Sequence, residues 1–221
     1  MTDLEKICAD AYEARVKIGT LDTDIKNKVL NDAADNLLKA EAEILEANKR
    51  DVATAEENMK AKSMIDRLSL DHDRLLGMAD GLRQIAKLAD PIGEVMSMAK
   101  RPNGLIIGKR RVAIGVVGII FEARPNVTSD AFGLCFKTGN CVILKGGSDA
   151  INTNIAIVKA LKKALTDNLV SDAALALIES TDRETTNAFM KMDQYVDVLI
   201  PRGGAGLIQN VVKNADRKSV V

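Results

Sequence analysis

The segment from residue 110 to residue 150 constrains the fold more than any other part of the chain. It begins with a long apolar run, RRVAIGVVGIIFE, which ends at the polar loop ARPN; a helical stretch, a second apolar run and the turn KGGSDA follow. Near-continuous apolar runs of this length are typical of strands that are buried on both faces of a parallel sheet. The segment therefore predicts a strand, helix and strand of an α/β sheet with a right-handed crossover.

The same alternation continues to the end of the sequence. We expect strands at 112–121, 141–145, 173–178 and 196–200, and helices at 128–138, 149–166, 182–190 and from Ala205 onward. Gly139 stands where a helix C-terminal glycine belongs, and Ser148 can cap the helix that starts at Asp149. Thr181 and Glu184 have the spacing of a capping box. The expected fold class is α/β, a Rossmann-like parallel sheet with helices on both faces.

Amphipathic helices occupy the first part of the chain. Apolar residues recur at helical spacing from Leu4 to Leu88, and the last helix stops before Pro91, because a residue that precedes proline disfavours helix. After Pro91, VMSMAKR and LIIGKRR flank the turn Pro102-Asn103-Gly104, which predicts a hairpin at a sheet edge. We expect a single domain, 1–221, made of a helical region at 1–90 and a β/α region at 91–221.

Composition excludes several classes of function. The 31 basic and 31 acidic residues balance, so no net field favours nucleic acid or an anionic membrane. Aromatic residues make up 3% of the chain and there is no Trp, which argues against platforms for stacked bases. The sequence has no run of about 20 uncharged apolar residues that could span a membrane, and the charged N-terminus does not resemble a signal peptide. We expect a cytoplasmic protein that binds neither nucleic acid nor a membrane.

The cysteines offer neither a metal site nor a nucleophile. Cys8, Cys135 and Cys141 lack zinc-site spacing, and His72 is the only histidine. Each cysteine stands where a small apolar residue is expected, so we interpret all three as buried, inert thiols. A nucleophilic thiol needs a lowered pKa from a nearby cation or helix N-terminus. Cys135, late in a helix, and Cys141, at the start of a strand, do not meet that condition.

Hydrogen-bond donors follow the first apolar strand. In the loop EARPN, proline fixes the chain before Asn126 and restricts Arg124 to an extended conformation. A preorganised amide such as that of Asn126 suits an oxyanion, and the carboxyl ends of parallel strands are where α/β sheets bind ligands. Two structural alternatives remain open: an Asn after a Pro is common in turns, and Glu122 and Arg124 could simply pair with each other.

Two glycine turns also follow strands. Lys145 ends the second strand, and Gly146 and Gly147 let the backbone approach a ligand before Ser148, where a helix N-terminus presents free amides. The turn PRGGAG at 201–206 repeats this arrangement, although neither turn has the G-x-G-x-x-G pattern. The neutral and cationic groups of the first turn favour NADPH over NADH; Asp149, one residue further, weakens that argument. Ordinary tight turns, and a solvated Arg202, are the alternatives.

The motifs together carry a resemblance to a known family. VAIGVVGIIFEARPNVTSDAFGLCFKTGNCVILKGGSDA at 112–150 and DVLIPRGGAGLI at 197–208 closely resemble the γ-glutamyl phosphate reductases, also called glutamate-5-semialdehyde dehydrogenases. This family is a branch of the aldehyde dehydrogenase superfamily. LRQIAKLADPIGEV at 82–95 fits as well, and the resemblance extends to about Asn214. EARPN and PRGGAG are specific to this branch, so the resemblance is more informative than either glycine turn.

The resemblance implies NADPH-dependent reduction of L-glutamyl 5-phosphate to L-glutamate 5-semialdehyde, the second step from glutamate to proline. In that reaction a cysteine thiolate displaces phosphate, and hydride then reduces the thioester. By position, Asn126 would donate its amide to the oxyanions, and Lys145, with Gly146, Gly147 and Ser148, would bind the adenosine ribose or its 2′-phosphate. Gly203 and Gly204 would bring backbone to the pyrophosphate. Contacts from Arg124 and Arg202 to the acyl phosphate are our own hypothesis, based on charge and location.

Members of this family continue for about as many residues again, through the segment that supplies the nucleophilic cysteine. We therefore expect the cofactor domain of a truncated reductase, without its catalytic domain and without reductase activity on its own. A homo-oligomer, or a partner chain that supplies the missing domain, is compatible with this interpretation. The alternatives are a non-catalytic nucleotide-binding or interaction protein and an unrelated phosphate-binding α/β domain.

Overall fold

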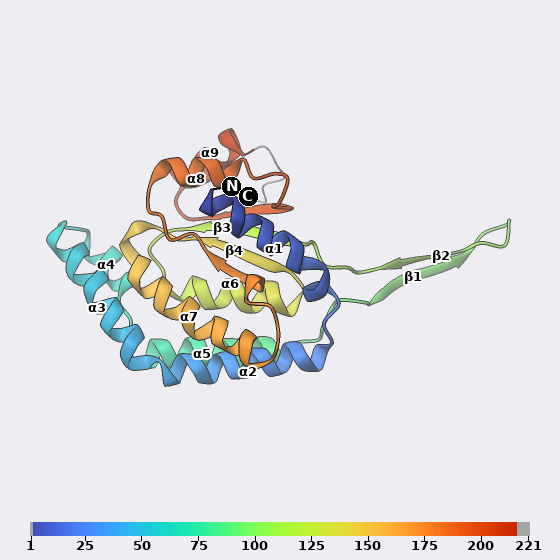
Figure 1. Ribbon diagram of the computed structural model, residues 1–221, viewed down its shortest axis with the longest axis horizontal. Helices are drawn as coiled ribbons and strands as arrows, with labels where there is room; N and C mark the ends of the chain where they lie inside the picture. Colours follow the sequence, from blue (N-terminus) through green and yellow to red (C-terminus); the bar gives the residue numbers. More distant parts are fainter. Residues whose placement is uncertain (1, 216–221) are drawn as a thin grey trace.

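A four-stranded parallel sheet lies at the centre of the protein (Figure 1). The structure is a computed structural model that describes residues 2–215. The strands are β3 (Val116–Phe121), β4 (Cys141–Lys145), β5 (Leu175–Leu177) and β6 (Val198–Arg202), in the order β5-β4-β3-β6. Every residue of β3 and β4 is buried. The predicted α/β class and parallel pairing are confirmed, because these apolar runs need cover on both faces.

Helices cover both faces of the sheet (Figure 1). On one face, α1 (Asp3–Gly19) packs against β3, β4 and β5. On the other face, α6 (Asn126–Lys137) and α7 (Ile151–Asp167) contact the sheet, and α2 (Thr23–Lys39) and α5 (His72–Lys87) pack outside them. The remaining helices are α3 (Glu41–Glu57), α4 (Lys62–Leu68), α8 (Arg183–Met190) and α9 (Ala205–Asn214). One continuous core, from Leu4 to Val211, joins the early helices to the sheet.

The predicted hairpin exists, but its predicted place at a sheet edge is wrong. Strands β1 (Val95–Lys100) and β2 (Ile106–Arg110) pair antiparallel as a separate two-stranded sheet. This arm projects away from the body of the protein (Figure 1), and all of its strand residues are exposed. The local pattern of apolar residues encoded the two strands but not a pairing with the central sheet.

The structure confirms one of the three predicted helix-terminal residues and contradicts the other two. Gly139 has φ of +71° after α6, as a helix C-terminal glycine should. The proposed cap at Ser148 is wrong, because Ser148 opens a short 3-10 turn and makes no capping hydrogen bond. The proposed Thr181 capping box is also wrong: Asp182 caps α8 by accepting from the backbone N–H of Thr185.

A buried polar network fixes α3 and α4 against the start of α7. The Asp51 carboxylate of α3 accepts hydrogen bonds from the backbone N–H of Thr153 (2.8 Å) and from the Asn152 side-chain amide (2.7 Å). Asn48, one helical turn earlier, donates to the carbonyl of Leu68 (2.9 Å) and accepts from the backbone N–H of Leu70 (2.7 Å). Because Asp51 and Asn48 are buried, their polar groups need these bonds, which hold α4 in a defined position against α3.

Candidate functional site

Three turns meet at the carboxyl edge of the sheet. Strand β3 lies between β4 and β6, with Ile120 opposite Lys145 and Phe121 opposite Arg202. The backbone N–H of Gly204 donates to Glu122 Oε1 at 3.1 Å. A Cβ added at Gly147 would lie 3.6 Å from Glu122 Cα. The segment after β3 is therefore in contact with both glycine turns, as the sequence predicts for neighbouring parallel strands.

Two adjoining cavities open at this edge. The first has a volume of about 370 Å³ and is lined by residues of α4, α5 and α6, among them Arg74, Gly77, Asn126 and Asp130. The second has a volume of about 360 Å³ and is lined by residues that include Glu122, Arg202, Gly203 and Gly204. Arg67 and Arg124 line both cavities. Both volumes fall in the range of small-molecule sites.

Asn126 lies on the first turn of a helix rather than in an open loop. Pro125 has φ of −59° and ψ of −33°, and α6 begins at Asn126, two residues before the predicted start. The Asn126 amide donates to Asp130 Oδ2 at 3.2 Å. Burial raises the pKa of the Asp130 carboxyl, while the charge of Arg202 and the Asn126 hydrogen bond oppose that shift. The helix thus fixes the Asn126 amide at the wall of the first cavity.

Three of the four arginines that line the two cavities have no hydrogen-bond or ion-pair partner in the described part of the chain; the fourth, Arg74, is paired with Asp66. Arg67, Arg124 and Arg202 are exposed, and within residues 2–215 none of their guanidinium groups makes a hydrogen bond or ion pair with a protein group. The alternative pairing of Glu122 with Arg124 is wrong, because Glu122 instead accepts from the Gly204 backbone. Three partner-free guanidinium groups around two cavities are an arrangement that suits an anionic ligand.

The turn after β4 is more closed than the sequence indicates. Lys145 is 4% exposed, and its ammonium donates to the carbonyl of Gly146 at 3.0 Å. Burial lowers the pKa of Lys145, and the charge of Asp182 opposes that shift. A Cβ at Gly146 would lie 2.5 Å from Asn154 Nδ2, so any larger residue there would force the buried Asn154 side chain to move. Residues 145–148 line neither of the cavities that hold Asn126 and Arg124.

The second glycine turn opens a helix whose first amides are free for a ligand. Gly204 precedes α9 and offers no side-chain cap. A Cβ at Gly206 would meet nothing within 4 Å, so the backbone there faces open space. A third cavity, of about 510 Å³, continues from this turn between α8 and α9 and is lined by Arg183, Asn187 and Asn210. The N-terminus of a helix in this setting can accept a phosphate group.

The predicted burial of the thiols is confirmed. Cys8, Cys135 and Cys141 are buried, and burial raises the pKa of each thiol to about 12. At neutral pH these thiols stay protonated and do not act as nucleophiles. Within residues 2–215, no three His, Cys, Asp or Glu side chains are grouped to hold a metal ion. Likewise, the described helices include none with the length and apolar character of a membrane span.

Sequence reasoning missed two residues of the site. Asp130 stands four residues after Asn126, and this spacing alone places both side chains on one face of α6. A search of the predicted helix for polar residues at that spacing could have found it. Arg67 reaches the site from α4 through the tertiary packing of the helical region, and no local signal near EARPN points to it.

Comparison with known proteins agrees with this architecture. The model of the aldehyde dehydrogenase family matches residues 1–221. The γ-glutamyl phosphate reductase of Agathobacter rectalis is 99% identical over 215 residues, which are 97% of this chain and 51% of that protein. The enzyme of the same description from a Thermoanaerobacter species is 53% identical over 213 residues, 96% of this chain and 51% of that protein. The chain spans about half the length of the curated relatives that it matches.

Solved structures give the same result. The crystal structure of γ-glutamyl phosphate reductase from Thermotoga maritima has a TM-score of 0.97 at 38% identity, covering 99% of this chain and 53% of that one. The Saccharomyces cerevisiae enzyme has a TM-score of 0.92 at 28% identity, covering 100% of this chain and 56% of that one. An engineered glycolyl-CoA reductase with bound NADP⁺ shares the fold, with a TM-score of 0.70 at 16% identity over 99% of this chain and 46% of that one. The resemblance read from EARPN and PRGGAG is confirmed, and the chain belongs to the aldehyde dehydrogenase family.

Proposed function

We propose that this chain is the cofactor-binding half of a γ-glutamyl phosphate reductase, which reduces L-glutamyl 5-phosphate to L-glutamate 5-semialdehyde with NADPH. The relatives of that description support the assignment. One observation carries it: the Asn126 amide is fixed at a cavity wall, next to guanidinium groups without protein partners and a glycine turn that opens a helix. This combination supplies an oxyanion donor, an anion site and a phosphate site at one edge of the sheet.

The residues present fit a nicotinamide dinucleotide. The free amides at the start of α9 suit a pyrophosphate, and the cavity between α8 and α9 has room for the adenosine end. The turn at Lys145 has a cation and no carboxylate directly at the strand end, which favours a cofactor with a 2′-phosphate. When bound, this cofactor supplies the hydride of the reaction.

The residues of this chain would stabilise the negative charge that develops on the acyl oxygen and on the leaving phosphate during the reaction. Asn126 donates its amide to the acyl oxygen as that oxygen becomes negative. Arg124 and Arg202 bind the phosphate of the acyl phosphate and stabilise it as it leaves. The thiolate that attacks the acyl carbon is none of Cys8, Cys135 or Cys141, because their pKa values of about 12 keep them protonated. We assign that thiolate to the half of the relatives that this chain does not span.

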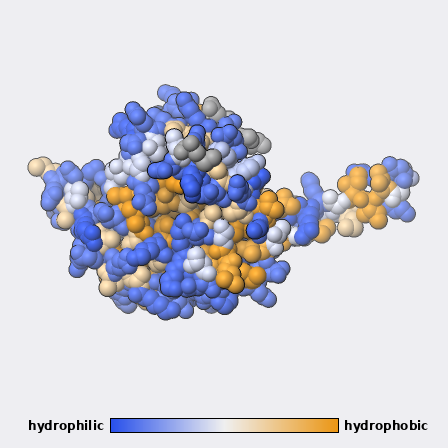
Figure 2. Space-filling model, viewed as in Figure 1, coloured by the Kyte–Doolittle hydropathy of each residue, from blue (hydrophilic) through white to orange (hydrophobic). Residues whose placement is uncertain are grey.

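The projecting hairpin supports association with a second copy of the enzyme. Met98 and Ile106 are each 66% exposed on the two strands, and the space-filling view shows apolar surface along the arm (Figure 2). Such exposed strands present unpaired backbone groups that pair readily with another chain. We expect Ile106→Lys to lower the oligomeric state in light scattering. An unchanged oligomer would contradict a role for this strand.

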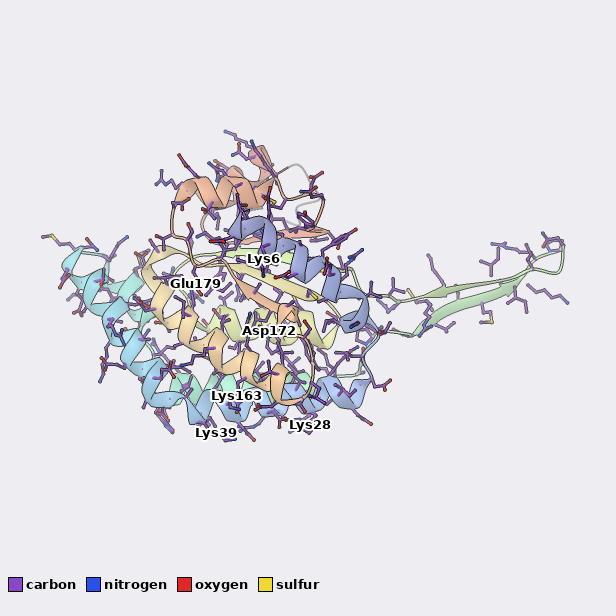
Figure 3. All side chains as sticks on the ribbon, in the orientation of Figure 1. Lys6, Lys28, Lys39, Lys163, Asp172 and Glu179 are labelled. Carbon is purple, nitrogen blue, oxygen red and sulfur yellow. The ribbon has the colours of Figure 1, made fainter. Side chains whose placement is uncertain are left out.

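Cofactor binding to this chain tests the assignment. Titration with NADPH and NADH, followed by cofactor fluorescence, should give tighter binding of NADPH. Lys145→Met should weaken NADPH binding about tenfold or more, because it removes a charged hydrogen-bond donor to phosphate. Lys39→Met is the matched control, since Lys39 lies at the end of α2 in the outer helical layer (Figure 3). Equal affinity for the two cofactors, with no effect of Lys145→Met, would contradict the NADPH assignment.

A further inference from the structure

The first cavity contains charged groups of both signs that the proposed oxyanion and phosphate contacts do not use. It extends from Asn126 between α6 and the segment that joins α4 to α5. The glycine turn after β6 lines the second and third cavities but not the first, so the first cavity lies apart from the proposed cofactor site. What this cavity can bind depends on which of its charges are already paired.

Asp130 is a carboxylate without a cationic partner in contact. It is half-buried, and the Asn126 amide is its hydrogen-bond donor within the described residues. No described Lys or Arg forms an ion pair with it, and the charge of Arg202 acts on it only from beyond contact distance. A carboxylate that is partly removed from water gains most from an ammonium group at contact distance. Asp130 therefore presents an acceptor for a cationic group of a ligand.

Arg67 provides the opposite charge. Arg74, its neighbour in the cavity wall, is already committed, since it donates to Asp66 Oδ1 (2.8 Å) and to the carbonyl of Ser69 (2.7 Å). Arg67 has no such partner in residues 2–215 and lines the cavity from the end of α4. The hydrogen bonds of Asn48 to the α4–α5 segment hold this end of the helix in place. Arg67 thus stands on a positioned helix end and lines the same cavity as Asp130.

Two glycines of α5 make the room between these charges. Gly77 lines the cavity, and a Cβ there would meet nothing within 4 Å. A Cβ at Gly81, one helical turn later, would lie 3.9 Å from Asp130 Oδ1. A glycine in the interior of a helix costs about 1 kcal/mol relative to alanine. The helix therefore gives up intrinsic stability on the face where a side chain would enter the cavity.

We propose that Asp130 binds the α-ammonium and Arg67 the α-carboxylate of the glutamyl group, so that the first cavity selects an α-amino acid substrate. This inference rests on the proposed function, because it assumes that the γ-acyl group lies at Asn126. Asn126 and Asp130 are one helical turn apart, a separation of about 5–6 Å between Cβ atoms. That spacing places the two ends of a short glutamyl chain against the two side chains. A zwitterion satisfies charges of both signs, which a simple dicarboxylate does not.

The test compares aldehydes that differ only in these two groups. The full-length Agathobacter rectalis relative provides the enzyme, assayed as phosphate-dependent reduction of NADP⁺ with an aldehyde. L-glutamate 5-semialdehyde has both groups, 5-oxopentanoate lacks the ammonium, and 4-aminobutanal lacks the carboxylate. In that enzyme, replacing the residue that aligns with Asp130 by Asn (Asp130→Asn) should lower kcat/KM for L-glutamate 5-semialdehyde about tenfold or more, mainly through a higher KM. It should leave 5-oxopentanoate nearly unaffected. Arg67→Gln should give the complementary pattern, with 4-aminobutanal nearly unaffected.

These comparisons separate binding from a structural role. If Asp130 only orients the Asn126 amide, Asp130→Asn will lower activity equally on all three aldehydes, and the inference is overturned. Gly77→Leu should raise KM for aldehydes but not for NADP⁺, because its side chain fills the cavity, and Gly77→Ala is its small control. Equal KM values for Gly77→Leu and Gly77→Ala would also contradict the inference. A wild-type enzyme that fails to oxidise L-glutamate 5-semialdehyde would instead contradict the proposed function itself.

Discussion

Replacing Asp51 with alanine should destabilise the fold more than any exposed charge change on the same helix. Asp51 is 3% exposed, and its two oxygens accept from four donors at the start of α7. The shortest of these bonds is from Thr153 Oγ1, at 2.6 Å. Helix α7 has Ala150 at its N-cap, with no side-chain cap of its own. The Asp51 carboxylate from α3 therefore supplies both the hydrogen bonds and the negative charge that the start of α7 needs.

The magnitude follows from the buried donors that would lose their acceptor. Removing one partner of a buried, charged hydrogen-bond network costs about 3–5 kcal/mol, because the remaining polar groups stay desolvated. For a domain of about 200 residues, each kcal/mol lowers Tm by about 2–4 °C. Asp51→Ala should therefore lower Tm by about 6–20 °C and reduce the free energy of unfolding in urea, with the m-value unchanged.

The control is Glu43→Ala on the same helix. Glu43 accepts from Lys159 at 2.7 Å, but the pair is largely exposed, and such pairs contribute at most about 1 kcal/mol. Circular dichroism during urea titration and thermal melting measures both variants against the wild type. If Asp51→Ala and Glu43→Ala lose the same small amount of stability, the network around Asp51 does not cap α7 as the geometry indicates.

Further predictions address the thiols, the single histidine and the second glycine turn. The three buried thiols should react with a thiol reagent only after denaturation, and rapid labelling of any of them in the folded chain would be inconsistent with their burial. The hydrogen bond of His72 Nδ1 to Glu41 Oε1 (2.8 Å) raises the pKa of His72 above 6.5. Its contribution to stability is thus present below about pH 6.5 and is lost as pH rises through the folded-state pKa. Glu41→Gln should reduce the shift in an NMR titration, since Glu41 is its largest cause. Gly203→Ala places a Cβ 2.7 Å from the Glu122 carboxyl and should weaken NADPH binding. Gly206→Ala is the control and should have a smaller effect, because a Cβ there meets nothing within 4 Å. Equal affinities of the two variants for NADPH would argue against this turn as a cofactor contact.

The buried strands were predictable because burial on both faces leaves a direct mark on the sequence. An uninterrupted apolar run allows a strand such as β3 or β4 to be recognised from composition and length alone. The start of β3 was less predictable, since residues 112–115 are also mostly apolar. In the structure the chain bends there: Gly115 has φ of +126°, and the backbone N–H groups of Ile114 and Gly115 donate to Asn140 Oδ1 instead of to a strand.

Caps were predicted less well because several residues nearby can serve as the first acceptor. At the start of α8, Thr181 and Asp182 both carry a suitable oxygen, and Asp182 has the position from which it reaches the backbone of Thr185. At the start of α7, the acceptor comes from Asp51, which is far away in the sequence. A local pattern cannot indicate a cap that another helix provides.

The candidate site also has a part that the local sequence predicts and a part that depends on tertiary packing. Arg124, Asn126 and the PRGGAG turn follow strands, and parallel strands bring their carboxyl ends to one edge, so topology alone gathers them. Arg67 joins them only because hydrogen bonds of Asn48 hold the end of α4 against α3. The motif thus encodes the part of the site made by the sheet, and long-range packing encodes the part made by the helices.

Charge at this edge of the sheet also distinguishes a binding site from a structural cluster. Elsewhere in the described chain, two buried ammonium groups have partners: Lys26 forms an ion pair with Asp90 at 2.8 Å, and Lys137 donates to Asn27 Oδ1 and to the carbonyl of Ala86. Arg67, Arg124 and Arg202 line the two cavities and have no comparable partners in residues 2–215, whereas Arg74 in the first cavity is paired with Asp66. Neighbouring like charges disfavour the ligand-free state, and an anion that binds between them removes that cost. This arrangement favours the proposal that the two cavities bind an anionic ligand, because the unpaired guanidinium groups do not stabilise the free protein.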